Sequence, residues 1–233
     1  MKETLVVDGI GRVDVQFSQH GRGRPILLLH GGGGPGSVLP WGELLARERH
    51  ASVMTPTHPG LVGTHRPETL TDVRGLARVY AALLEQLDLQ DVAVVGHSIG
   101  GWIAAEIGIA PHERVSSLVL VDAVGLEDRD HPAADVFSGE PRSESGRALK
   151  MYAGNLMEPT LRRRLSASKM PPTLVVWGDD DDVVDREYGR AYTNAIAGAE
   201  LKVLRGVGHA PPFEAPELLS EVVWPFLVKH SRV

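Results

Sequence analysis

The sequence predicts an α/β domain built on a mostly parallel, twisted sheet with helices on both faces and a short helical cap insertion. The first observation behind this prediction is a set of continuous aliphatic runs, because strands covered on both faces lose the alternation of apolar and polar residues. The second is that stretches of helical periodicity separate these runs. The third is one run, 92–95, that passes through a glycine-flanked serine directly into a helical stretch.

The N-terminal quarter is expected to form a hairpin and then two strands around a helix. Two β-type runs, 4–8 and 13–17, lie on either side of a turn that contains two glycines, and this pattern indicates a hairpin. Four aliphatic residues at 26–29 indicate a buried strand, which ends at a loop of five glycines and one proline, 31–36. The next elements expected are a helix at 41–49 and a strand at 51–55.

The clearest helix is predicted at 71–89. Thr71 or Asp72 can cap its N-terminus, and apolar residues recur on one face at helical spacing: Val73, Leu76, Ala77, Tyr80, Leu83, Leu84 and Leu87. The same two patterns predict the remaining elements, which are strands at 92–95, 115–121, 173–177 and 200–204 and helices at 101–110, 186–197 and 216–229.

The character of the sequence changes between residues 126 and 170. Charged residues, glycines and prolines interrupt the pattern there, and only two short helical pieces are expected, near 146–154 and 159–167. We therefore expect residues 1–125 and 171–233 to form the core of the domain and residues 126–170 to form a cap, or lid, inserted over it.

Ser98 lies at the bend between the strand 92–95 and the helix that follows it. A side chain at so tight a bend is crowded on both sides, and Gly96 and Gly100, two positions before and after the serine, relieve that crowding. A serine exposed in this way can act as a nucleophile if a base removes its proton and a third group orients the base.

Candidate partners for Ser98 follow later strands. Four aspartates, 179–182, come directly after the strand 173–177, and His209 comes shortly after the strand 200–204. Ligands of parallel α/β sheets bind beyond the carboxyl ends of the strands, so these residues are expected to lie near Ser98. The chain order Ser, Asp, His is the order of hydrolases that use such a bend for their nucleophile.

The chain resembles the α/β-hydrolase fold family over essentially its whole length. The resemblance rests on stretches taken together: His30-Gly31 with the glycines after it, Gly96 to Gly101, Leu118 to Asp122, Trp177 to Asp181, and Gly208-His209 with Glu214, Pro216 and Phe226-Leu227 downstream. It implies that Ser98 is the nucleophile and His209 the general base and acid. It also implies that the backbone N–H groups of Ile99 and of Gly32 or Gly33 bind the oxyanion.

Two aspartates compete for the third catalytic position. The family pattern of glycine, acidic residue, any residue and aspartate aligns Asp181, with Asp179 at the preceding acidic position. Asp122, at the end of the strand 115–121, is the alternative, because some members of the family place the acid there. We predict Asp181 and keep Asp122 as the alternative.

Composition excludes several other kinds of site. The chain has no cysteine, which rules out disulfides, thiolate nucleophiles and cysteine-bound metals. Its formal net charge of −6 and the lack of a basic stripe give no basis for nucleic-acid binding. No metal or cofactor is expected, since the histidines show no ligand spacing. No apolar run suits a signal peptide or a membrane span, so a cytoplasmic protein is expected; the oligomeric state is left open.

Other residues are expected to support or line the site. His30 is expected to stabilise the glycine loop by hydrogen bonding, and His97 to shape the bend at Ser98. Four aromatic residues are candidates for lining an acyl pocket, although packing in the core or the cap explains each of them equally well: Trp41, Trp102, Phe137 and Tyr152.

The expected activity is hydrolysis of a small carboxylic ester through an acyl-enzyme on Ser98. The glycine loop 30–36 is also similar to that of the family's C–C bond hydrolases that act on meta-cleavage products, so such a hydrolase, or a perhydrolase, is the alternative. A ligand receptor on a hydrolase scaffold, with slow turnover, is a third hypothesis from a different class. The short insertion favours small substrates.

Overall fold

The computed structural model describes residues 1–110, 113–136 and 143–232. Within them eight strands form one sheet in the order β1-β2-β4-β3-β5-β6-β9-β10. The strands of this sheet are β1 (Lys2–Val7), β2 (Gly11–Gly21), β3 (Arg24–Leu29), β4 (Ala51–Thr57), β5 (Val92–His97), β6 (Val115–Val121), β9 (Thr173–Gly178) and β10 (Glu200–Leu204). β1, β2 and β4 pair antiparallel, and every pair from β4 to β10 is parallel. The predicted fold class is confirmed.

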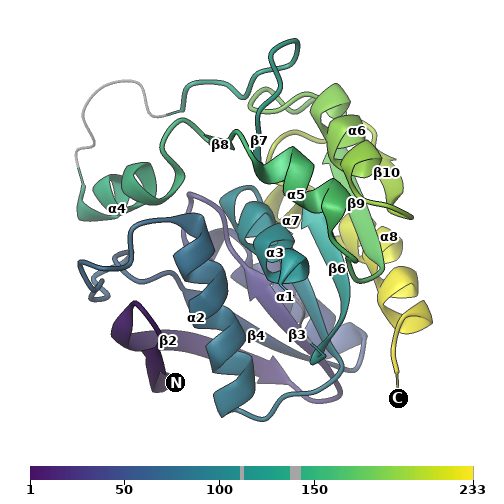
Figure 1. The fold of residues 1–233 in the computed structure, drawn as a ribbon. Helices are drawn as coiled ribbons and strands as arrows, with labels where there is room; N and C mark the ends of the chain where they lie inside the picture. Colours follow the sequence, from purple (N-terminus) through teal and green to yellow (C-terminus); the bar gives the residue numbers. More distant parts are fainter. Residues whose placement is uncertain (111–112, 137–142, 233) are drawn as a thin grey trace.

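Helices cover both faces of the sheet (Figure 1). One face carries α2 (Val73–Gln86), α3 (Ile99–Ile109) and α6 (Arg186–Ala195), whose apolar side chains join one large core cluster. The other face carries α1 (Leu39–Glu48) and α8 (Pro216–Lys229), which share a second cluster. The central strands β5, β6 and β9 are buried along their whole length, which explains their continuous aliphatic runs.

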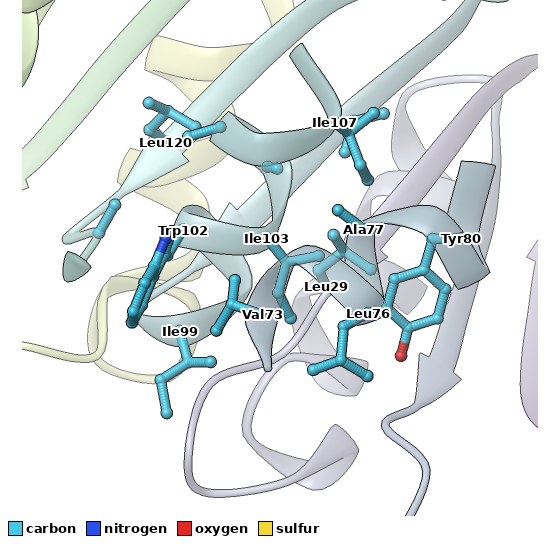
Figure 2. Close-up of a cluster of buried hydrophobic side chains, with 14 of the residues drawn as sticks. Leu29, Val73, Leu76, Ala77, Tyr80, Ile99, Trp102, Ile103, Ile107 and Leu120 are labelled. Carbon is cyan, nitrogen blue, oxygen red and sulfur yellow. The ribbon is translucent and has the colours of Figure 1, made fainter. Parts of the chain in front are cut away.

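The first cluster fixes α3, the helix that follows Ser98. Figure 2 shows side chains of α2 and α3 packed together with Leu29 and Leu120 of the sheet. α3 is apolar apart from Glu106 and almost completely buried, so its first turn, which includes Ile99, is held rigidly against the sheet. α2 begins at Val73, and the side chain of Asp72 accepts a hydrogen bond from the Gly75 N–H, as expected of a cap.

The segment expected to be a cap contains two helices, α4 (Glu144–Ala153) and α5 (Leu161–Ala167), close to the two predicted helical pieces. A short parallel pair joins the start of this segment to the stretch between its two helices: β7 (Gly125–Leu126) pairs with β8 (Met157–Glu158). Four short elements were not predicted, because elements of two to four residues have no periodicity to detect: the two strands of this pair, the 3-10 turn η1 (Pro35–Ser37) and α7 (Pro211–Glu214).

Gly100 is where α3 comes closest to the backbone of β3. A Cβ atom added at Gly100 would lie 2.2 Å from the Leu29 carbonyl oxygen and 2.7 Å from that of His30. These are backbone atoms of a buried strand, which cannot move aside easily. The glycine is therefore required for close packing of the helix on the sheet.

We expect Gly100→Ala to lower the free energy of unfolding by about 3 kcal/mol or more, because overpacking at a rigid site is among the most destabilising changes. Urea unfolding followed by circular dichroism measures the effect. Gly36→Ala is the matched control, since an added Cβ there has no heavy atom within 4 Å. Equal stability of the two variants would contradict this account of the packing.

Candidate active site

Ser98 lies between β5 and α3 in a strained backbone conformation, with φ 55° and ψ −117°. Non-glycine residues seldom adopt positive φ, and such strain is concentrated at functional sites. Three backbone hydrogen bonds hold it there: the Ser98 N–H donates to Val121, and its carbonyl accepts from Trp102 and Val124. The sequence predicts an exposed side chain at this bend, but Ser98 is only 8% exposed, and its hydroxyl faces His209.

His209 lies in the loop between β10 and α7 and hydrogen-bonds on both sides of its ring. Its Nε2 is 3.0 Å from Ser98 Oγ, and its Nδ1 is 2.8 Å from Asp181 Oδ2. With the proton on Nδ1, the imidazole donates to the carboxylate and accepts from the serine hydroxyl. The structure therefore brings together the three residues that the sequence singled out.

Asp181 is held by the loop that follows β9. Its Oδ1 accepts hydrogen bonds from the N–H groups of Val183 (2.8 Å) and Val184 (3.0 Å), which leaves Oδ2 for His209. Burial raises the pKa of Asp181, but the hydrogen bonds from His209 and the two amides outweigh burial, and the net pKa lies below 3.8. Asp181 is thus ionised at neutral pH.

Asp122 follows β6 directly, and no hydrogen bond joins its carboxyl to His209 among the described residues. It is fully buried, and its Oδ1 accepts a hydrogen bond from the Gly178 N–H at 2.9 Å. Burial and the charge of Asp181 raise the pKa of Asp122 well above 3.8, so this carboxyl is expected to be neutral. Between the two candidate acids, the structure places Asp181 on His209.

The glycine loop after β3 packs directly against Ser98. A Cβ atom added at Gly31 would lie 2.9 Å from the Cβ of Ser98. The backbone N–H groups of Gly32, Gly33 and Ile99 donate to no other described residue, and Ile99 is the first residue of α3, where helical N–H groups have no partner in the helix. These groups are available to a ligand.

Two buried histidines stabilise the glycine loop from behind. His30 Nδ1 donates to the Gly31 carbonyl at 2.7 Å, and its Nε2 accepts from the His58 N–H. His58 Nε2 donates to the His30 carbonyl, and its Nδ1 accepts from the Tyr80 hydroxyl. The expected support of the loop by His30 is confirmed; the part of His58 was not predicted, since nothing in its local sequence indicates it. Every ring nitrogen of the pair has a partner only when both histidines are neutral.

We expect stability to fall as the pH is lowered from about 6.5 toward 4. Burial lowers the pKa of His58 and of His97 to about 4 and that of His30 well below 6.5. In this window the unfolded chain binds protons that the folded chain does not, and each histidine costs about 1.4 kcal/mol per pH unit. The raised pKa values of Asp122 and of His131 act in the opposite direction.

The three buried histidines together outweigh Asp122 and His131. The free energy of unfolding should therefore fall by roughly 2 kcal/mol between pH 6.5 and 5. Urea unfolding at a series of pH values measures it. Equal stability at pH 7 and pH 5 would contradict the neutral, buried state of these histidines.

The structure places the four aromatic residues predicted to line an acyl pocket in different surroundings. The prediction is wrong for Trp41, which is fully buried in the second core cluster and donates from its indole N–H to Ser220 Oγ. Trp102 and Tyr152 line a cavity of about 250 Å³ between α2, α3 and α4, but Ser98 and His209 are not among its lining residues. Phe137 lies outside the described residues.

Leu149 of α4 is a pocket candidate that the sequence did not reveal. Its Cδ1 lies 3.9 Å from the position of a Cβ added at Gly32, so this side chain of α4 faces the glycine loop. Its spacing within α4 marks it only as a buried helical residue, and only the tertiary structure shows what it covers.

The residues that the structure describes lack two further features, a candidate metal site and a membrane-spanning helix. They include no group of three histidine, aspartate or glutamate side chains that could bind a metal ion. They also include no helix with the length and apolar character needed to cross a membrane.

Comparison with known proteins places the chain in a family. The sequence model of the "alpha/beta hydrolase fold" matches residues 24–141, about half of the chain. A 2-hydroxy-6-oxo-2,4-heptadienoate hydrolase of Pseudomonas putida is 32% identical over 242 residues, which cover 85% of this chain and 87% of that protein. The RutD protein of Azorhizobium caulinodans is 39% identical over 119 residues, but that match spans 51% of this chain and only 44% of the relative.

Solved structures show the same fold. A thermophilic esterase from Thermogutta terrifontis superposes with a TM-score of 0.82 at 21% identity, covering 99% of this chain and 100% of the other. An esterase from Exiguobacterium antarcticum gives a TM-score of 0.83 at 20% identity, covering 98% and 100%. The family match, the relative at 32% identity and the shared fold together show that this chain is a member of the alpha/beta hydrolase fold family.

Proposed function

We propose that this protein is a serine hydrolase that cleaves a small carboxylic ester through an acyl-enzyme on Ser98. The observation that supports this most directly is the unbroken chain of hydrogen bonds from Ser98 Oγ to His209 and from His209 to Asp181. A serine hydroxyl is a poor nucleophile at neutral pH, and this arrangement provides both a base to accept its proton and a carboxylate to stabilise the imidazolium.

The proposed reaction has two steps. Ser98 Oγ attacks the ester carbonyl carbon while His209 takes the hydroxyl proton and then delivers it to the leaving alkoxide. The negative oxygen of the tetrahedral intermediate accepts hydrogen bonds from the N–H of Ile99 and of Gly32 or Gly33. Water, deprotonated by His209, then attacks the acyl-enzyme; as the bond to Ser98 Oγ breaks, His209 returns the proton to that oxygen and the acid is released.

Labelling with a fluorophosphonate tests the proposal, because this reagent forms a stable adduct only with an activated serine. We expect one adduct per chain, on the peptide that contains Ser98, and a parallel loss of hydrolysis of p-nitrophenyl acetate. Intact mass and peptide mapping measure the adduct. Hydrolysis that persists after Ser98 is fully labelled would overturn the proposal.

A C–C bond hydrolase is the second candidate, and one observation favours it. The relative at 32% identity, which matches most of this chain, is named as a 2-hydroxy-6-oxo-2,4-heptadienoate hydrolase. Parallel assays with p-nitrophenyl esters of increasing acyl length and with a 2-hydroxy-6-oxo-dienoate distinguish the two. The substrate with the higher kcat/KM decides between them, whereas a single slow turnover with retained product would favour a ligand receptor.

A further inference from the structure

Glu214 binds the backbone on both sides of His209. Its Oε2 accepts a hydrogen bond from the Gly208 N–H at 2.7 Å, and its Oε1 accepts one from the Ala210 N–H at 2.9 Å. Both oxygens of one carboxylate therefore accept from the backbone N–H groups of the residues immediately before and after this histidine. Hydrogen bonds to an ionised acceptor are stronger than neutral ones, so the loop is held firmly at this position.

His97 holds the backbone carbonyl of His209. Its Nε2 donates to the His209 carbonyl at 2.6 Å. His97 is buried next to Ser98, which lowers its pKa to about 4, so the ring keeps one proton and a fixed role as donor at neutral pH. The carbonyl of His209 and the N–H groups before and after it in the chain thus all have defined partners.

A purely local role does not account for Glu214. It is the last residue of α7 (Pro211–Glu214), and a bond to the Ala210 N–H alone would be an ordinary cap of this short helix. The second bond, to Gly208, lies outside the helix and on the far side of His209. A Cβ atom at Gly208 would lie 2.9 Å from Glu214 Oε2, so a glycine at this position allows the close approach.

We propose that Glu214 is a positioning residue for His209, and this inference rests on the function proposed above. By fixing the backbone of His209 it keeps the imidazole in line between Asp181 and Ser98 while the proton moves. A small misplacement of a catalytic group costs a large factor in rate. Because Glu214 is not proposed to contact the substrate, its loss should lower kcat and leave KM nearly unchanged.

Two variants and a control test this role. We expect Glu214→Ala to lower kcat for p-nitrophenyl acetate by about 10- to 100-fold with KM within about twofold. Glu214→Gln keeps one acceptor oxygen and should give a smaller loss. Glu217→Gln removes the same charge from an exposed position at the start of α8 and should keep the native kcat. Urea unfolding confirms that each variant is folded; a folded Glu214→Ala variant with native kcat would overturn the inference.

A double-mutant cycle separates action through His209 from a general loss of structure. In a His209→Ala background, Glu214→Ala should cause no further loss of the residual rate, since the group that it positions is gone. The same fold loss in both backgrounds would overturn the inference. If instead fluorophosphonate labelling of Ser98 leaves hydrolysis intact, the proposed function itself has failed, so the two failures are distinguishable.

Discussion

Replacing Ser98 with alanine should lower kcat for p-nitrophenyl acetate by about 10⁵-fold or more, because the residue that forms the acyl-enzyme is lost and no other step replaces it. His209 lies 3.0 Å from Ser98 Oγ, so the base loses the proton donor for which it is placed. The N–H groups of Ile99 and the glycine loop remain, and they should leave a residual rate above that of water. Assays of p-nitrophenol release measure the kcat of the native enzyme and the residual rate of the variant.

Ser52→Ala is the matched control for this experiment. Ser52 lies at the start of β4, at the opposite end of the sheet from the site, and its hydroxyl accepts a hydrogen bond from Gln19. The control should keep the native kcat. A Ser98→Ala variant with the rate of the control would show that another group attacks the substrate.

Replacing Asp181 with asparagine should lower kcat by about 10³- to 10⁴-fold, whereas Asp122→Asn should change it by less than about tenfold. An asparagine at 181 cannot stabilise the imidazolium, and its amide can hold His209 in the wrong tautomer. Burial raises the pKa of Asp122 and so favours its neutral form, and an asparagine oxygen can still accept the hydrogen bond from Gly178. In each variant one carboxylate oxygen is replaced by an amide nitrogen, so the two variants form a matched pair.

The same pair of variants decides between the two acids that the sequence left open. Measurements of kcat and KM with one ester suffice, provided that urea unfolding shows both proteins to be folded. A large loss in Asp122→Asn together with near-native activity in Asp181→Asn would reverse the assignment.

The sequence by itself determined the longer strands and helices and their order along the chain. Continuous aliphatic runs predicted β3, β5, β6 and β9, because burial on both faces of a parallel sheet leaves a direct trace in the local composition. The glycines around Ser98 likewise report a local requirement, the tight bend and the close approach of α3 to β3. Such features depend on residues near one another in the chain, so they can be recognised from the sequence alone.

The tertiary structure decided every question that depends on residues distant in the chain. It placed Asp181 rather than Asp122 on His209, buried Trp41 in the core, and brought Glu214 to both sides of the histidine. Each outcome depends on which polar atoms meet in the folded protein and on how deeply they are buried. The local sequence cannot decide them, because an aspartate that follows a strand looks the same whether or not it contacts His209. Local periodicity records which face of an element is apolar, but the partner of a buried polar group is fixed only when the elements pack together.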